Sequence, residues 1–128
     1  MRYLSAFIFL MMMAACEKAI NFQPQNADTA VVVEAYIENG QAPIVILSKS
    51  MDYFSKINQD ILANSFINGA TIFISNGTKT HKLREYIVPV LSGYNLFYYS
   101  IDSFDLATAF VGEFNKAYSL RIIVDGKE

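Results

Sequence analysis

Turn dipeptides recur along this chain and constrain its fold more than any other feature of the sequence. Each pairs an asparagine or an aspartate with a glycine, and they are Asn39-Gly40, Asn68-Gly69, Asn76-Gly77 and Asp125-Gly126. These residue types tolerate the positive φ angles that tight hairpin turns require. A chain that can reverse direction at these points favours short antiparallel strands over long helices.

Six short runs beside these turns are rich in β-branched and aromatic residues. They are Ala30–Glu38, Pro43–Ser48, Ala70–Ser75, Thr78–Glu85, Tyr94–Ile101 and Ala117–Asp125. Apolar and polar residues alternate in two of these runs, and the apolar ones are predicted to face the core. They are Ala70, Ile72, Ile74, Tyr118, Leu120, Ile122 and Val124. Short strands at modest spacing, separated by turns that contain glycine, predict an all-β domain of the sandwich type.

Two longer segments interrupt the run of predicted strands. Residues 52–67 carry apolar side chains at the spacing of a helical turn, namely Ile57, Ile61 and Leu62. Residues 103–111 could hold a short helix, since Ser103 or Asp105 could cap residues 106–110. Both segments are predicted to lie in connections and not in the sheets.

The first sixteen residues have the layout of a secretory signal. Arg2 supplies a positive charge, Tyr3–Met13 is an almost unbroken apolar run, and two alanines precede Cys16. As a helix, this segment would reach roughly 20 Å against about 30 Å of bilayer hydrocarbon, so a membrane span is the weaker interpretation. We therefore predict a signal peptide over residues 1–15.

Cys16 is the only cysteine of the chain, so it cannot form an internal disulfide. The tetrapeptide Met13-Ala14-Ala15-Cys16 resembles the bacterial lipobox, with methionine where leucine is usual. This resemblance implies that Cys16 is lipidated and becomes the first residue of the mature protein. Several acyl chains hold a protein durably on a bilayer, because each buried methylene contributes about 0.8 kcal/mol. Residues 16–29 are then a polar tether and residues 30–128 the folded domain.

Composition excludes several classes of protein. Hydrophobic residues make up 53% of the chain and charged residues 17%, which excludes a disordered polar chain. The formal net charge of −2 lacks the basic footprint of a nucleic-acid-binding protein. The sequence also contains no glycine-rich loop of the kind that cradles phosphate.

Few residues could carry catalysis or bind a metal. His81 is the single histidine and stands in a polar alternating run with Lys79 and Lys82, so a solvated strand position is expected. Asp102 and Asp105 are close in sequence, but no loop of alternating oxygen ligands surrounds them. We predict no catalytic residue, no cofactor and no metal site.

Phe97, Tyr98 and Tyr99 follow one another on a predicted strand. Successive strand side chains point to opposite faces, so at least one of these rings is expected to face outward. The three residues could form an aromatic contact surface for sugars or for a partner. Packing against a loop or the second sheet is the alternative that we favour.

Thr29 is a candidate modification site in the predicted tether. The tripeptide Asp28-Thr29-Ala30 resembles the O-glycosylation motif of Bacteroidetes envelope proteins. The polar surroundings of Thr29 would leave room for a sugar.

Several segments occur in an order that is informative as a set. They are Cys16-Glu17-Lys18, Val31–Ile37, Asn39-Gly40, Val45–Ser50, Asp52-Tyr53-Phe54, Asn68–Ile74, Gly93-Tyr94, Tyr118–Ile122 and Asp125-Gly126-Lys127. This ordered set resembles the N-terminal part of the DUF4249 family, which are lipoproteins of Bacteroidetes with no assigned activity. The resemblance implies an immunoglobulin-like or regulatory-domain-like β-sandwich, incomplete at its C-terminus, that is exported to the outer membrane.

The same resemblance bears on partners and on completeness. It implies a role beside a TonB-dependent receptor, and it transfers no catalytic or binding residues, because none are established for the family. Family members continue past the position that matches Lys127, so this chain is expected to be a fragment or a shortened product. A sandwich without its last strand would expose an unpaired edge that can pair with a partner.

Together these observations predict a non-catalytic binding or accessory module, lipid-anchored through Cys16 on the periplasmic face of the outer membrane or at the cell surface. The expected partners are a TonB-dependent receptor and a glycan or peptide ligand. Two alternatives stay open. One is an inert fragment of a longer lipoprotein. The other is a carboxylate-based hydrolase, which would need two acidic side chains that converge in a cleft with raised pKa values.

Overall fold

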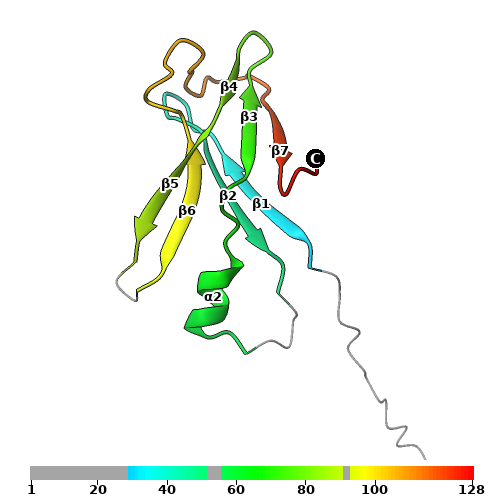
Figure 1. Ribbon diagram of the computed structural model, residues 1–128. Helices are drawn as coiled ribbons and strands as arrows, with labels where there is room; N and C mark the ends of the chain where they lie inside the picture. Colours follow the sequence, from blue (N-terminus) through cyan, green and yellow to red (C-terminus); the bar gives the residue numbers. More distant parts are fainter. Residues whose placement is uncertain (1–28, 52–55, 91–92) are drawn as a thin grey trace, which may run out of the picture.

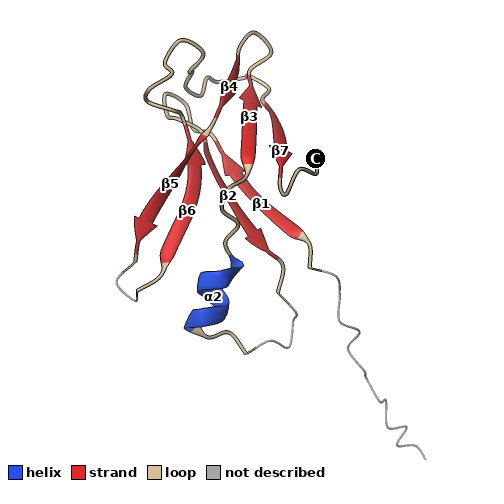
Figure 2. Cartoon of the chain, viewed as in Figure 1, coloured by secondary structure: helices blue, strands red, loops and turns tan. Residues whose placement is uncertain are grey.

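The computed structural model describes residues 29–51, 56–90 and 93–128, which form strands and one short helix (Figure 1). The predicted signal peptide and most of the tether lie outside the described residues. The elements are β1 (Val31–Tyr36), β2 (Ile44–Lys49), α2 (Gln59–Ser65), β3 (Thr71–Ser75), β4 (Thr80–Lys82), β5 (Arg84–Pro89), β6 (Asn95–Ser100) and β7 (Ser119–Ile123). Figure 2 shows that strands account for most of the regular structure.

The strands form two antiparallel sheets. The first has four strands in the order β1-β2-β6-β5, and the second has three in the order β4-β3-β7. The sheets pack face to face, which confirms the predicted all-β sandwich. Turn chemistry accounts for part of this arrangement, because the glycines of all four predicted turn pairs adopt positive φ angles between 71° and 85°.

The core lies between the inner faces of the two sheets. Alternation on β2 and β3 buries every second side chain, and the buried apolar set is Val45, Leu47, Ile67, Ile72, Ile74, Leu83 and Tyr99. Leu120, Ile122 and Val124 from the β7 region pack against this set, as their alternation predicts. The predicted core positions of Ile72 and Ile74 are confirmed.

The single strand predicted over Thr78–Glu85 is wrong, because this segment is divided between the two sheets. β4 pairs with β3, whereas β5 pairs with β6. Leu83 lies at the crossing and is buried, and its N–H donates to the carbonyl of Ile72 at 2.8 Å. Burial alternates through the crossing, with His81 and Leu83 buried and Lys82 and Arg84 exposed, so periodicity alone gives no sign that the strand changes sheets.

Helical spacing in residues 52–67 correctly predicted α2. Its N-terminal cap is Asn58, whose Oδ1 accepts the N–H of Ile61 at 2.8 Å. The helix expected in residues 103–111 is wrong. Asp102 closes a turn there, since its carbonyl accepts the N–H of Asp105 at 3.1 Å. No helix in the described part of the chain has the length and apolar character needed to cross a bilayer.

Candidate functional site

Two strands end their sheets on the same side of the sandwich. In the described part of the chain, β1 pairs along its length only with β2, and β7 only with β3. Figure 1 shows β1 and β7 near each other on that side. We call the gap between them the open side. Because neither strand has a second neighbour, the inner faces of both sheets are incompletely covered there.

Side chains of β1 show this lack of cover. All six residues of the strand are exposed. The register nevertheless places Val33 and Ala35 opposite the buried Leu47 and Val45, and therefore on the inner face. In a complete sandwich that face would be buried, yet Val33 keeps 44% of its surface exposed. The inward side chains of β7 are only half-buried.

Backbone groups of β1 also point into the open side. In an antiparallel pair, alternate residues direct both their N–H and C=O to the same neighbour. The carbonyl of Ala30 accepts the N–H of Ser50 at 2.8 Å, which places Ala30 in the set that faces β2. By alternation, Val31, Val33 and Ala35 direct their N–H and C=O away from β2.

The edge of β7 is partly covered by the turn that follows it. Asp125 and Gly126 have φ angles of 51° and 75°, as in the type I′ turns that join hairpin strands. Val124 and Lys127 then exchange two hydrogen bonds of 2.9 Å across this turn, on the side of β7 away from β3. One antiparallel bridge therefore already occupies the end of this edge.

Two cavities lie along the open side. The larger, of about 450 Å³, is bordered by Val31 of β1 and by Val124 just beyond β7. The smaller, of about 180 Å³, is bordered by Tyr36 of β1 and Leu120 of β7, with Tyr118 beside them. The smaller cavity lies between β1 and β7, and the larger lies between the start of β1 and the residues just beyond β7, so the open side is hollow near each of its ends.

The predicted aromatic contact surface does not exist as one surface. Tyr99 faces the core and is 1% exposed. Tyr98 lies on the opposite face of β6 and stacks on Tyr86, with ring centroids 5.3 Å apart and planes at 17°. Phe97 and Tyr98 are half-buried. The packing alternative holds for Tyr99, because strand alternation directs its ring between the sheets.

The hydroxyl of Tyr99 fastens the turn before β3 to the four-stranded sheet. It donates to Glu85 Oε2 at 2.8 Å and accepts the N–H of Ala70 at 3.1 Å. Glu85 Oε2 also accepts the N–H of Gly69, at 2.6 Å. Burial, together with the neighbouring Glu85 carboxylate, raises the pKa of Tyr99 to about 12, while the N–H of Ala70 acts in the opposite direction.

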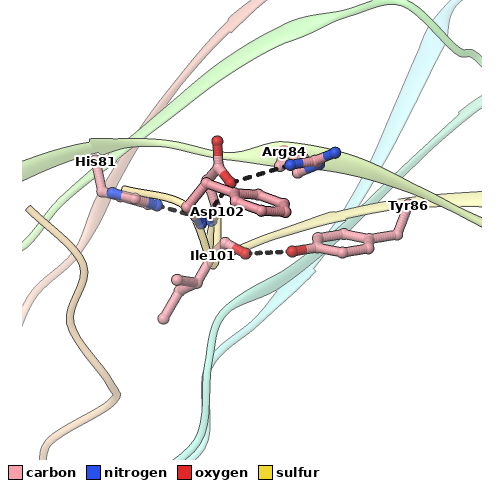
Figure 3. Close-up of polar contacts among 6 residues, drawn as sticks. His81, Arg84, Tyr86, Ile101 and Asp102 are labelled. Carbon is pink, nitrogen blue, oxygen red and sulfur yellow. Dashed lines mark hydrogen bonds and ion pairs between the residues drawn. The ribbon is translucent and has the colours of Figure 1, made fainter. Parts of the chain in front are cut away.

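His81 is fully buried, so the solvated strand position predicted for it is wrong. Its Nε2 accepts the N–H of Asp102 at 3.0 Å, and its Nδ1 lies 2.8 Å from Thr108 Oγ1. Because Nε2 is an acceptor, the proton of the neutral ring is on Nδ1, which donates to Thr108. Figure 3 shows the ring beside Asp102. His81 therefore joins β4 to the segment that follows β6.

The same segment holds Asp102 in its ionised form. Asp102 Oδ1 accepts the N–H of Phe104 at 3.0 Å and lies 3.4 Å from Arg84 Nη1. The hydrogen bond from the Phe104 N–H contributes most, and Arg84 adds to it. Together they hold the pKa of Asp102 below its usual value. This direction is opposite to the raised pKa that the hydrolase alternative requires. Beside this pair, the Tyr86 hydroxyl donates to the carbonyl of Ile101 at 2.7 Å (Figure 3).

The described residues were predicted to contain no metal site and one candidate modification site, Thr29. Within the described ranges, no group of three or more His, Cys, Asp or Glu side chains could hold a metal ion. Cys16 lies outside the described residues, so its lipidation stays a prediction. Thr29 is exposed and borders the larger cavity of the open side.

Comparison with known proteins adds no relative. No protein-family model matches the chain, and neither a curated protein nor a solved structure matches it. The resemblance to the DUF4249 family therefore stays a prediction.

Sequence reasoning predicted an unpaired edge left by a missing last strand but did not assign that edge to β1. A signal was present, because the strand begins with Val31-Val32-Val33 and contains neither lysine nor proline. Edge strands commonly carry those residues to prevent pairing with other chains. A run of three valines breaks the alternation expected of a strand with one solvated face.

Proposed function

We propose that this chain is a non-catalytic binding module of the cell envelope, and that it takes up an extended segment of a partner protein at the open side. One observation carries the proposal. Among the described residues, the β1 edge turns backbone groups with no strand partner and apolar side chains towards the same gap, whose other wall is β7.

The chemistry of the gap favours a β-strand as its occupant. A partner strand supplies N–H and C=O groups at the spacing of the β1 edge, and every second side chain points into the gap. A sugar would leave the apolar walls uncovered, and a lipid chain would leave the backbone groups of Val31 and Val33 without partners. The partner segment is therefore expected to alternate apolar and polar residues.

The envelope location is proposed from the sequence. Lipidation of Cys16 would hold the domain at the outer membrane, where the resemblance to the DUF4249 family suggests a TonB-dependent receptor as neighbour. An extended segment of such a receptor is a candidate occupant of the open side.

A pair of lysine substitutions on β1 tests the binding site. Val33→Lys places a charge in the open side, whereas Val32→Lys places the same charge on the outer face of the same strand. The two valines are 44% and 39% exposed, so the substitutions are matched in burial. The probe is a short fluorescein-labelled peptide of alternating threonine and valine with lysine at each end, and its anisotropy is followed as the full chain is added.

We expect saturable binding of the peptide. Val33→Lys should weaken that binding by at least about tenfold, a loss of about 1.4 kcal/mol, because its ammonium group would be desolvated in the gap. Val32→Lys should leave the affinity within about twofold of the unsubstituted chain. Absence of binding, or an equal loss in both variants, would overturn the proposal.

A further inference from the structure

Residues 101–118 join β6 to β7 and pack weakly over much of their length. Phe104 and Leu106 are 83% and 68% exposed, so neither anchors the segment by burial. The firm attachments are the two hydrogen bonds to His81, from Asp102 and to Thr108. Arg84 adds two contacts, an ion pair with Asp102 at 3.4 Å and a guanidinium 4.7 Å from the centroid of the Phe104 ring. We call residues 102–108 the latched loop.

We propose that His81 is an acid-sensitive latch, and that protonation of its ring releases the latched loop from β4. The proton adds to Nε2, which then becomes a donor and can no longer accept the N–H of Asp102. Nδ1 keeps its proton and stays a donor, so the bond to Thr108 is lost only when the ring itself leaves its position. The N–H of Asp102 and the new N–H at Nε2 would then point at each other across the 3.0 Å that now separates the two nitrogens.

Charged groups around the ring decide where it moves. Asp102 is engaged by Arg84 and by the N–H of Phe104, and Asp105 Oδ2 lies 3.4 Å from Thr108 Oγ1. Their carboxylates attract the charged ring and so offset part of the loss of the Asp102 hydrogen bond. On the opposite side of the ring, β3 places the apolar Ile74 beside His81. Lys79 is the nearby cation on the strand side, and its Nζ lies 3.5 Å from the carbonyl of Ala107 in the latched loop. A buried cation facing an apolar strand is costly, so the protonated ring leaves its position.

Release of the latched loop would affect the open side through the contacts that follow Thr108. Thr108 is two residues before Phe110, which stacks on Tyr118 with centroids 5.9 Å apart. Tyr118 borders the smaller cavity of the open side. The latch therefore gives that site a means of responding to acid. This last step rests on the proposed function, whereas release of the loop itself does not.

The test follows two signals of the full, unsubstituted chain, labelled with ¹⁵N and purified in detergent micelles. His81 is the only histidine, so its ring nitrogen shifts are unambiguous. The second signal is the hydrogen-exchange protection factor of the Asp102 amide, measured from about pH 8 to about pH 5. The Arg121 amide, which pairs with Phe73 between β3 and β7, is the internal control.

We expect the Nδ1–H tautomer at the alkaline end. As the pH is lowered, the protection of the Asp102 amide from hydrogen exchange should fall by at least about tenfold. The midpoint of this fall should equal the midpoint of ring protonation, and the protection of the Arg121 amide should not change. In His81→Gln, a side-chain carbonyl can accept the Asp102 N–H without titrating, so protection should not vary with pH. If this variant fails to fold, the two curves of the unsubstituted chain still decide.

Three results would overturn the latch. One is protection of Asp102 that persists through ring protonation. Another is a pair of midpoints that differ by more than about one pH unit. The third is an Nε2–H tautomer at about pH 8. None of these results depends on peptide binding, so failure of the latch and failure of the strand-binding proposal are separable.

Discussion

Replacement of Tyr99 by phenylalanine removes one hydroxyl from the centre of the sandwich and leaves the ring in place. The hydroxyl is the contact through which Glu85 on β5 and Ala70 before β3 are joined. Without it, the N–H of Ala70 loses its acceptor and Glu85 keeps only the N–H of Gly69. The substitution therefore probes the link between the two sheets and not the packing of the core.

The expected cost follows from the two hydrogen bonds. A hydrogen bond to a charged group contributes about 1.5–3 kcal/mol, and a neutral one about 1 kcal/mol. Glu85 is only half-buried, so water can replace part of the lost contact. We expect Tyr99→Phe to lower the free energy of unfolding by about 2–3 kcal/mol at neutral pH.

The raised pKa of Tyr99 adds a pH signature. Its pKa is about 12 in the fold, against 10.0 for an ordinary tyrosine. The stability from this group is thus fully present below about pH 10 and is lost as the pH rises towards about 12. A shift of two pKa units corresponds to at most about 2.7 kcal/mol, and solvent screening at Glu85 reduces it. Tyr99→Phe should lack this alkaline loss.

Urea unfolding at several pH values measures both effects. Tyr98→Phe is the matched control, because Tyr98 is the adjacent residue and its hydroxyl makes no hydrogen bond in the described part of the chain. Its removal should change the free energy of unfolding by less than about 0.5 kcal/mol. Equal effects of the two substitutions, or an alkaline loss that survives in Tyr99→Phe, would refute the reasoning.

Two further substitutions test the fold. Gly112→Ala should lower the free energy of unfolding by about 1–3 kcal/mol, since the new methyl group would overlap the backbone carbonyl of Glu38; an unchanged urea midpoint would contradict this. Asn58→Ala removes the cap that binds the N–H of Ile61 and should lower the free energy of unfolding by about 1 kcal/mol in the same assay. In a hydrogen-exchange measurement, amide protection should be lost first at the start of α2. Exchange that is unaltered there would count against the assigned cap.

Turn chemistry and alternation were sufficient to predict the class of fold. Asn39-Gly40 and Asp125-Gly126 lie in turns with positive φ at glycine, and Ile72 and Ile74 are buried as their spacing indicates. These properties depend on local sterics and on the period of a strand, both of which are present in the sequence itself. The change of sheet at Leu83 depends on which strands meet in space, so it could not be predicted.

His81 shows where local reasoning fails. Its neighbours Thr80 and Lys82 are polar and exposed, which favoured a solvated position. Strand parity, however, places His81 on the same face as Leu83, and its register partner is the buried Ile74. That parity was available as a signal. The hydrogen bonds that make burial tolerable come from residues more than twenty positions away, and no local pattern reveals them.

The central claim is that the open side receives a strand on the β1 edge. Its most direct test is hydrogen exchange at two adjacent amides of β1, with and without the alternating threonine–valine peptide. Val32 already pairs with Ser48 of β2, so its protection should not change. The amide of Val33, which faces the open side, should gain at least about tenfold in protection when the peptide is bound. Binding of the peptide that leaves the Val33 amide unprotected would contradict the account.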